Sequence, residues 1–103
     1  MADSYTIGQE RAADGSATLL HLGGELDITA RDVLGETLRA ALDDGDVVID
    51  LDAVTFIDSE ALGALVAAYH IARARPAGFR VVNARGVVAR VLKVSGALEL
   101  FGG

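Results

Sequence analysis

The sequence contains no cysteine and no tryptophan, a single proline, and only three phenylalanines and two tyrosines. Without cysteine there is no disulfide and no thiolate chemistry. No apolar run approaches the length of a membrane-spanning helix. The first ten residues, MADSYTIGQE, lack the basic stretch and apolar segment of a signal peptide. We therefore expect a cytoplasmic protein that does not insert into a membrane.

Because aromatic residues are scarce, the hydrophobic half of the sequence consists mainly of Val, Leu, Ile and Ala, and we expect an aliphatic core. A chain of 103 residues is most simply one domain. It is long enough to bury one core without a disulfide or a structural metal. We predict a single domain over residues 1–103, with its core over about residues 5–101.

The net charge of −6 argues against nucleic acid or an anionic membrane as a direct partner. The charges are also uneven, with fourteen acids and three bases up to Glu60, and one acid and six bases after it. This asymmetry has two interpretations. The acids are either an ordinary solvated surface or an acidic docking face near Ser59.

Patterns of apolar residues predict strands alternating with helices. We expect strands over residues 4–9, 17–22, 47–49 with 54–57, 79–84 and 98–101, and helices starting near residues 29, 59 and 86. An opening hairpin followed by such alternation implies an α/β fold. We predict a mixed four- to five-stranded sheet with an N-terminal β-hairpin, about three packed helices and right-handed crossovers.

Local signals suggest how the helices begin and end. Thr29 and Asp32 resemble a capping box, and Gly45 is a candidate left-handed cap. Gly96 is expected to cap the helix that opens at Gly86. The apolar side chains of that last helix are expected to point inward: Val87, Val88, Val91 and Leu92.

The stretch 47–70 organises the chain. Its two apolar runs lead to Asp58 and Ser59, and a helical pattern follows in which four residues share one face: Leu62, Leu65, Val66 and Tyr69. Either Asp58 or Ser59 can cap this helix, because a short side-chain oxygen accepts from its free N–H groups. A strand thus delivers one hydroxyl to a helix N-terminus.

The sequence offers little for catalysis. His21 and His70 fall inside a predicted strand and a predicted helix, and Ser59 lacks the flanking glycines of a nucleophile elbow. Asp50 and Asp52 lack the glycine and spacing of a calcium loop. The chain also has no P-loop and no G-x-G-x-x-G. We predict no enzymatic activity, no bound metal and no cofactor.

Three segments resemble the motifs of STAS domains, in order and in spacing. They are Gly24-Glu25-Leu26-Asp27; Phe56-Ile57-Asp58-Ser59 with Leu62-Gly63; and Val88-Ala89-Arg90-Val91-Leu92 with Ser95-Gly96. Stand-alone domains of this size in that family resemble anti-sigma factor antagonists. The resemblance implies a partner-switching protein.

By this resemblance, Ser59 is the residue that an anti-sigma factor serine kinase phosphorylates, and a serine phosphatase resets it. The unphosphorylated form binds the kinase and frees the sigma factor. Asp27, Asp58, Ser59 and Glu60 fall where the family contacts its partner. The alternative is a STAS subunit or scaffold of a lipid-transport or stress-signalling complex, in which Ser59 is only a cap.

The chain departs from the family pattern at two places. Many members carry Ser-Gly directly after the phosphoacceptor, where this chain has Glu60-Ala61. Members of the family also have a final helix, whereas here a strand is expected over residues 98–101. The first departure places a carboxylate beside the hydroxyl to be phosphorylated.

Overall fold

The computed structural model describes residues 4–102. The four strands in this range form one mixed sheet. Strands β1 (Tyr5–Arg11) and β2 (Ala17–Leu26) form the antiparallel N-terminal hairpin. β3 (Asp46–Ile57) runs parallel to β2, and β4 (Phe79–Val82) runs parallel to β3. The spatial order is β1-β2-β3-β4, so the predicted α/β class, hairpin and mixed sheet are confirmed.

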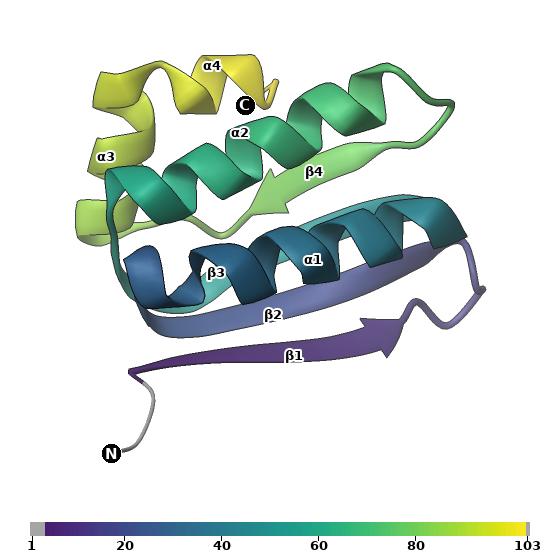
Figure 1. Cartoon of the computed structure of the whole chain (residues 1–103), viewed down its shortest axis with the longest axis horizontal. Helices are drawn as coiled ribbons and strands as arrows, with labels where there is room; N and C mark the ends of the chain where they lie inside the picture. Colours follow the sequence, from purple (N-terminus) through teal and green to yellow (C-terminus); the bar gives the residue numbers. More distant parts are fainter. Residues whose placement is uncertain (1–3, 103) are drawn as a thin grey trace.

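Two long helices connect the parallel strands: α1 (Ile28–Asp44) joins β2 to β3, and α2 (Ser59–Arg73) joins β3 to β4. Both lie side by side on the same face of the sheet (Figure 1). This is expected when successive crossovers of one hand move across a sheet in one direction. Two short helices, α3 (Gly86–Ser95) and α4 (Ala97–Leu100), complete the chain. Within residues 4–102, no helix is long and apolar enough to cross a membrane.

The core lies between the sheet and the two long helices, and it is aliphatic as predicted. Alternate residues of β2 and β3 are buried, as in a strand with one covered face, while α1 and α2 bury residues at helical spacing. The largest fully buried side chains from these four elements are Leu20, Leu22, Leu26, Leu34, Leu38, Val47, Ile49, Leu51, Ile57 and Leu65.

The opposite face of the sheet carries a polar cluster that crosses three strands. His21 lies between two carboxylates: its Nε2 is 2.6 Å from Glu10 Oε1 and its Nδ1 is 3.1 Å from Asp50 Oδ2. The Asn83 side-chain amide donates to Asp50 Oδ1 at 3.0 Å. The hydrogen bond to Glu10, followed by that to Asp50, raises the pKa of His21. These groups join β1, β2, β3 and the segment after β4.

The predicted fifth strand over residues 98–101 is wrong, because these residues belong to α4 and its last turn. The backbone N–H groups of Leu100 and Phe101 donate to the carbonyls of Gly96 and Ala97, which are helical bonds. The segment contains no β-branched residue to favour an extended strand. The Phe101 ring packs against the Phe79 ring, with their centroids 5.5 Å apart.

Several local predictions also need correction. The predicted capping box at Thr29 and Asp32 is absent, since α1 starts at Ile28 with Asp27 as its N-cap. Gly45 does end α1, but with φ 134° and ψ −144° instead of a left-handed conformation. Gly96, in contrast, adopts the predicted left-handed cap at φ 83°.

The two apolar runs before Asp58 form one continuous strand, β3, as expected. One further expectation, that Val87 points inward, is wrong. Val87 points outward, with 59% of its surface exposed, because α3 turns only Val88 and Leu92 fully into the core.

Candidate functional site

The candidate site lies where β2 and β3 end, at one edge of the sheet. Leu26 and Ile57 are register partners, so the residues after them, Asp27 and Asp58, leave neighbouring parallel strands side by side. The Asp58 backbone N–H donates to the Leu26 carbonyl at 3.0 Å and joins the two turns. Each aspartate caps the helix that follows it. The structure therefore brings Asp27 next to the predicted Asp58-Ser59-Glu60 segment.

The two capping carboxylates have local partners. Asp27 Oδ1 accepts from the Thr29 backbone N–H at 2.9 Å and from the Thr29 hydroxyl, and these bonds lower the pKa of Asp27. Asp58 Oδ1 accepts from the Ala61 backbone N–H at 2.9 Å. Both side chains therefore satisfy free N–H groups at a helix start. The alternatives for the cap of α2 are thus decided in favour of Asp58.

Ser59 is the first residue of α2 and is exposed. Since Asp58 supplies the cap, the Ser59 hydroxyl has no capping role, and it makes no hydrogen bond within residues 4–102. A hydroxyl at this position is free to react or to contact a partner. It also sits where the helix dipole favours negative charge.

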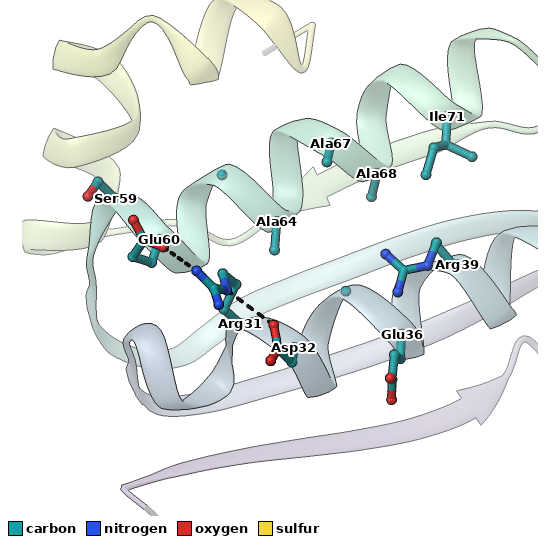
Figure 2. Close-up of a pocket in the computed structure, with 12 residues that line it drawn as sticks. Arg31, Asp32, Glu36, Arg39, Ser59, Glu60, Ala64, Ala67, Ala68 and Ile71 are labelled. Carbon is teal, nitrogen blue, oxygen red and sulfur yellow. Dashed lines mark hydrogen bonds and ion pairs between the residues drawn. The ribbon is translucent and has the colours of Figure 1, made fainter.

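Glu60 is held by Arg31, a residue that the sequence reasoning missed. Arg31 Nη1 lies 2.6 Å from Glu60 Oε1, and its Nε lies 3.2 Å from Asp32 Oδ1 (Figure 2). The hydrogen bond to Glu60, followed by that to Asp32, raises the pKa of Arg31. Arg31 and Glu60 are 29 positions apart, so no local signal links them. The Glu60 carboxylate on α2 is thereby paired with a cation on α1.

A groove of about 460 Å³ runs between α1 and α2 and ends at Ser59. Small residues let the two helices leave this space open: Gly35, Gly63, Ala64, Ala67 and Ala68. Figure 2 shows Arg31 closing the groove near Ser59, while Arg39 reaches toward α2 farther along. The groove is therefore lined by glycine and alanine residues between the helices and by charged side chains at its sides.

Two large apolar side chains are exposed beside the capping aspartates. Ile28, directly after Asp27, is 56% exposed, and Phe56, two residues before Asp58, is 43% exposed. These two groups add exposed apolar area to the edge of the sheet that carries Asp27 and Asp58.

The remaining acids considered at the sequence level have other roles. Asp50 belongs to the His21 cluster, and Asp52 Oδ1 lies 3.3 Å from Arg85 Nη2. Among the residues the structure describes, no group of three or more His, Cys, Asp or Glu side chains is arranged to hold a metal.

The fold and this edge together define a small α/β domain with a free hydroxyl at a helix start. A family model described as "Mlab, STAS domain" matches residues 10–101, so the chain belongs to the STAS domain family. No curated protein sequence matches the chain significantly.

Solved structures similar to this chain include several anti-sigma factor antagonists. One from Mycobacterium paratuberculosis is 31% identical, with a TM-score of 0.83 over 95% of this chain and 83% of that one. An antagonist STAS domain from Rhodobacter sphaeroides is 25% identical, with a TM-score of 0.62 over 77% and 86% of the two chains. The phosphorylated form of SpoIIAA, a Bacillus cell fate determinant, shares the fold at 17% identity, with a TM-score of 0.73 over 92% and 87%.

Proposed function

We propose that this chain is an anti-sigma factor antagonist controlled by phosphorylation of Ser59. The unphosphorylated form binds an anti-sigma factor serine kinase and frees the sigma factor, and phosphorylation releases the antagonist. A serine phosphatase restores the binding form. The observation that carries this proposal is the free, exposed Ser59 hydroxyl at the start of α2, beside the cap that Asp58 already supplies.

The geometry supports a switch that does not require unfolding. A phosphate on Ser59 adds about −1.5 to −2 charge. The N-terminus of α2 favours that charge, and Arg31 already neutralises Glu60 nearby. The main unfavourable effects are repulsion from Asp58 and the cost of desolvating the phosphate against a partner. We therefore expect the added charge to act across the interface.

The binding surface we propose is the sheet edge around the two capping aspartates. Asp27 and Asp58 supply negative charge, and Ile28 and Phe56 supply exposed apolar area. A partner with basic residues around an apolar depression would complement it. This assigns all four predicted contact residues, Asp27, Asp58, Ser59 and Glu60, to one interface.

The test is phosphorylation by an anti-sigma factor kinase encoded in the same genome. Wild type and Ser59→Ala are incubated with the purified kinase and ATP and analysed by intact mass and peptide mapping. One phosphate is expected on wild type, at Ser59, and none on Ser59→Ala. Ser16→Ala is the matched control and should be phosphorylated like wild type. Phosphate on any other residue, with Ser59 unmodified, would contradict the proposal.

The second candidate is an unphosphorylated STAS subunit or scaffold of a larger complex. It is favoured by Glu60, which stands where many relatives have serine and which Arg31 holds in place. In that case no kinase modifies the chain, and Ser59→Ala leaves assembly unchanged. The same mass analysis therefore separates the two candidates.

A further inference from the structure

The outward face of α3 is apolar and lies outside the core. Val87 and Val94 are 59% and 81% exposed, and Val91, between them on the same helix face, is partly buried. The spacing i, i+4, i+7 aligns these three side chains in one stripe. A depression of about 340 Å³ lies along the stripe, lined by Val87, Arg90, Val91, Val94 and Ser95. We call these five residues the α3 face.

Folding does not account for this stripe. α3 is attached to the core through Val88 and Leu92, which are 1% and 0% exposed, on its other side. A valine as exposed as Val94 loses little contact with water on folding, so it contributes little to stability. The stripe therefore points to a binding surface.

Both charged residues of α3 are positive. Arg90 and Lys93 are exposed, and neither has a carboxylate at ion-pair distance within the described part of the chain. The helix itself contains no acid. On a protein of net charge −6, α3 thus carries two cations on one side of its apolar stripe, and Arg90 is the one that lines the depression.

We propose that the α3 face docks an amphipathic helical segment of a partner protein, one that carries apolar residues at i, i+3/i+4 and i+7 with Asp or Glu beside them. Such a segment would place its apolar side chains along Val87, Val91 and Val94. Its carboxylates would meet Arg90 at the edge of the depression and extend toward Lys93, beyond it on the same side of α3, which gives the pairing specificity as well as charge complementarity.

Two other occupants fit the surface less well. In a symmetric dimer, α3 would face α3 of the second copy, and Arg90 and Lys93 of one copy would oppose those of the other. An anionic membrane would meet the same two cations, but also a molecule that is negative as a whole. An acidic peptide segment places no cations against Arg90 and Lys93, and because it is small it covers less of the negative surface than a membrane does. The inference does not depend on Ser59 or on any kinase.

The experiment titrates the intact protein with a synthetic helical peptide and follows backbone amide signals by NMR. The peptide is about 18 residues long, which is sufficient for partial helicity, with Leu at the stripe positions and Glu beside them. A second peptide has Lys at every Glu position. We expect the Glu peptide to shift the signals of residues 86–95 and to bind about tenfold or more tightly than the Lys peptide.

Variants test both parts of the surface. Val87→Ser with Val94→Ser should weaken binding of the Glu peptide by about tenfold, whereas Val33→Ser, at a 47% exposed valine on α1, should not. Arg90→Glu with Lys93→Glu should reverse the preference, so that the Lys peptide now binds more tightly. This gain is a readout that misfolding cannot produce.

Specific results would overturn the inference. Equal binding of the two peptides, shifts confined to another surface, or no response to the valine substitutions would exclude an acidic segment at this face. A concentration-dependent dimer that Val94→Ser abolishes would assign the face to a second copy. Binding to phosphatidylglycerol vesicles that the same change abolishes would assign it to a membrane.

Discussion

At the residue scale, the start of α2 divides two tasks between adjacent side chains. Asp58 accepts from the Ala61 backbone N–H and stabilises the helix, while the Ser59 hydroxyl makes no hydrogen bond among residues 4–102. Because the helix cap and the free hydroxyl belong to different residues, each can be changed without the other. Substitutions at Asp58 and at Ser59 should therefore have different effects on stability and on binding.

We expect Asp58→Ala and Ser59→Ala to differ in stability. Loss of the Asp58 cap should lower the free energy of unfolding by about 0.5–2 kcal/mol. Ser59→Ala should change it by less than about 0.5 kcal/mol, because it removes no hydrogen bond seen in the structure. Urea unfolding of wild type and both variants measures this. A loss for Ser59→Ala as large as that for Asp58→Ala would mean that the serine has a structural role.

Ser59→Asp should separate binding from stability. The new carboxylate lies at the positive end of the α2 dipole, a favourable term of about 0.3–1 kcal/mol that Asp58 opposes. The melting temperature should stay near that of wild type. Affinity for the anti-sigma factor kinase should fall about tenfold or more, which corresponds to about 1.4 kcal/mol at the interface.

A thermal melt paired with a binding titration tests this substitution, and Ser59→Asn serves as an uncharged control. Wild-type affinity of Ser59→Asp, or a loss that only follows lost stability, would argue against the switch.

At the element scale, the irregular end of β2 positions Asp27. The register of β2 with β3 shifts between Gly24 and Glu25, where Gly24 has φ +76°. A Cβ at this position would lie 2.1 Å from the Ser4 carbonyl oxygen, which is a backbone atom. Glycine is therefore required here for two reasons, its left-handed backbone and its close neighbour.

Two glycine substitutions should have opposite effects. Gly24→Ala should destabilise the domain by about 1 kcal/mol or more, because the conformation and the contact both exclude a side chain. Gly63→Ala is the matched control: this exposed glycine within α2 has open space around its Cβ direction. It should stabilise by about 0.5–1 kcal/mol. Chemical denaturation of both variants measures the two changes in the free energy of unfolding. Stabilisation by Gly24→Ala would contradict the requirement for glycine at the register shift.

At the scale of the whole molecule, the helices cover one face of the sheet and the His21 cluster ties strands together on the other. Imidazolium can donate from both ring nitrogens, to Glu10 and to Asp50, whereas neutral imidazole donates from only one. Protonation of His21 therefore favours the assembled sheet. The raised pKa of His21 agrees with this, because it means that the folded protein favours the protonated ring.

Stability should accordingly depend on pH through His21. The folded-state pKa is above that of the unfolded chain, so the stabilisation is complete below the ordinary imidazole pKa of about 6.5 and is lost as pH rises through the raised value. On the acid side, the Asn83 amide, a backbone N–H and His21 lower the pKa of Asp50. The stabilisation by ionised Asp50 is complete above the ordinary carboxyl pKa. It is lost as pH falls through the lowered pKa of Asp50.

Thermal melts across this range measure the effect. Wild type should lose stability relative to His21→Gln as pH rises from about 5.5 to about 8.5. His70→Gln, at an exposed histidine on α2, should keep the wild-type profile. A constant difference between wild type and His21→Gln would show that the cluster does not titrate with folding.

The sequence by itself determined the α/β order of elements, the hairpin, the aliphatic core and the position of Ser59 at a helix start. These features follow from local periodicity and from motif spacing, which short-range sterics and burial enforce. Only the tertiary structure decided which side chains meet across elements. Arg31 pairs with Glu60, and His21 joins Glu10 to Asp50, because helix packing and strand register bring distant positions together.

The difference between local propensity, apolar pattern and tertiary packing also explains two of the predictions that were wrong, the strand over residues 98–101 and the inward Val87. Residues 98–101 begin Leu98-Glu99-Leu100, which favours a helix, so a strand predicted from their apolar content goes against their local propensity. Val87 follows a helical apolar pattern, but a pattern cannot say which side of α3 faces the sheet. Local sequence determines the form of an element, whereas its neighbours determine which face is buried.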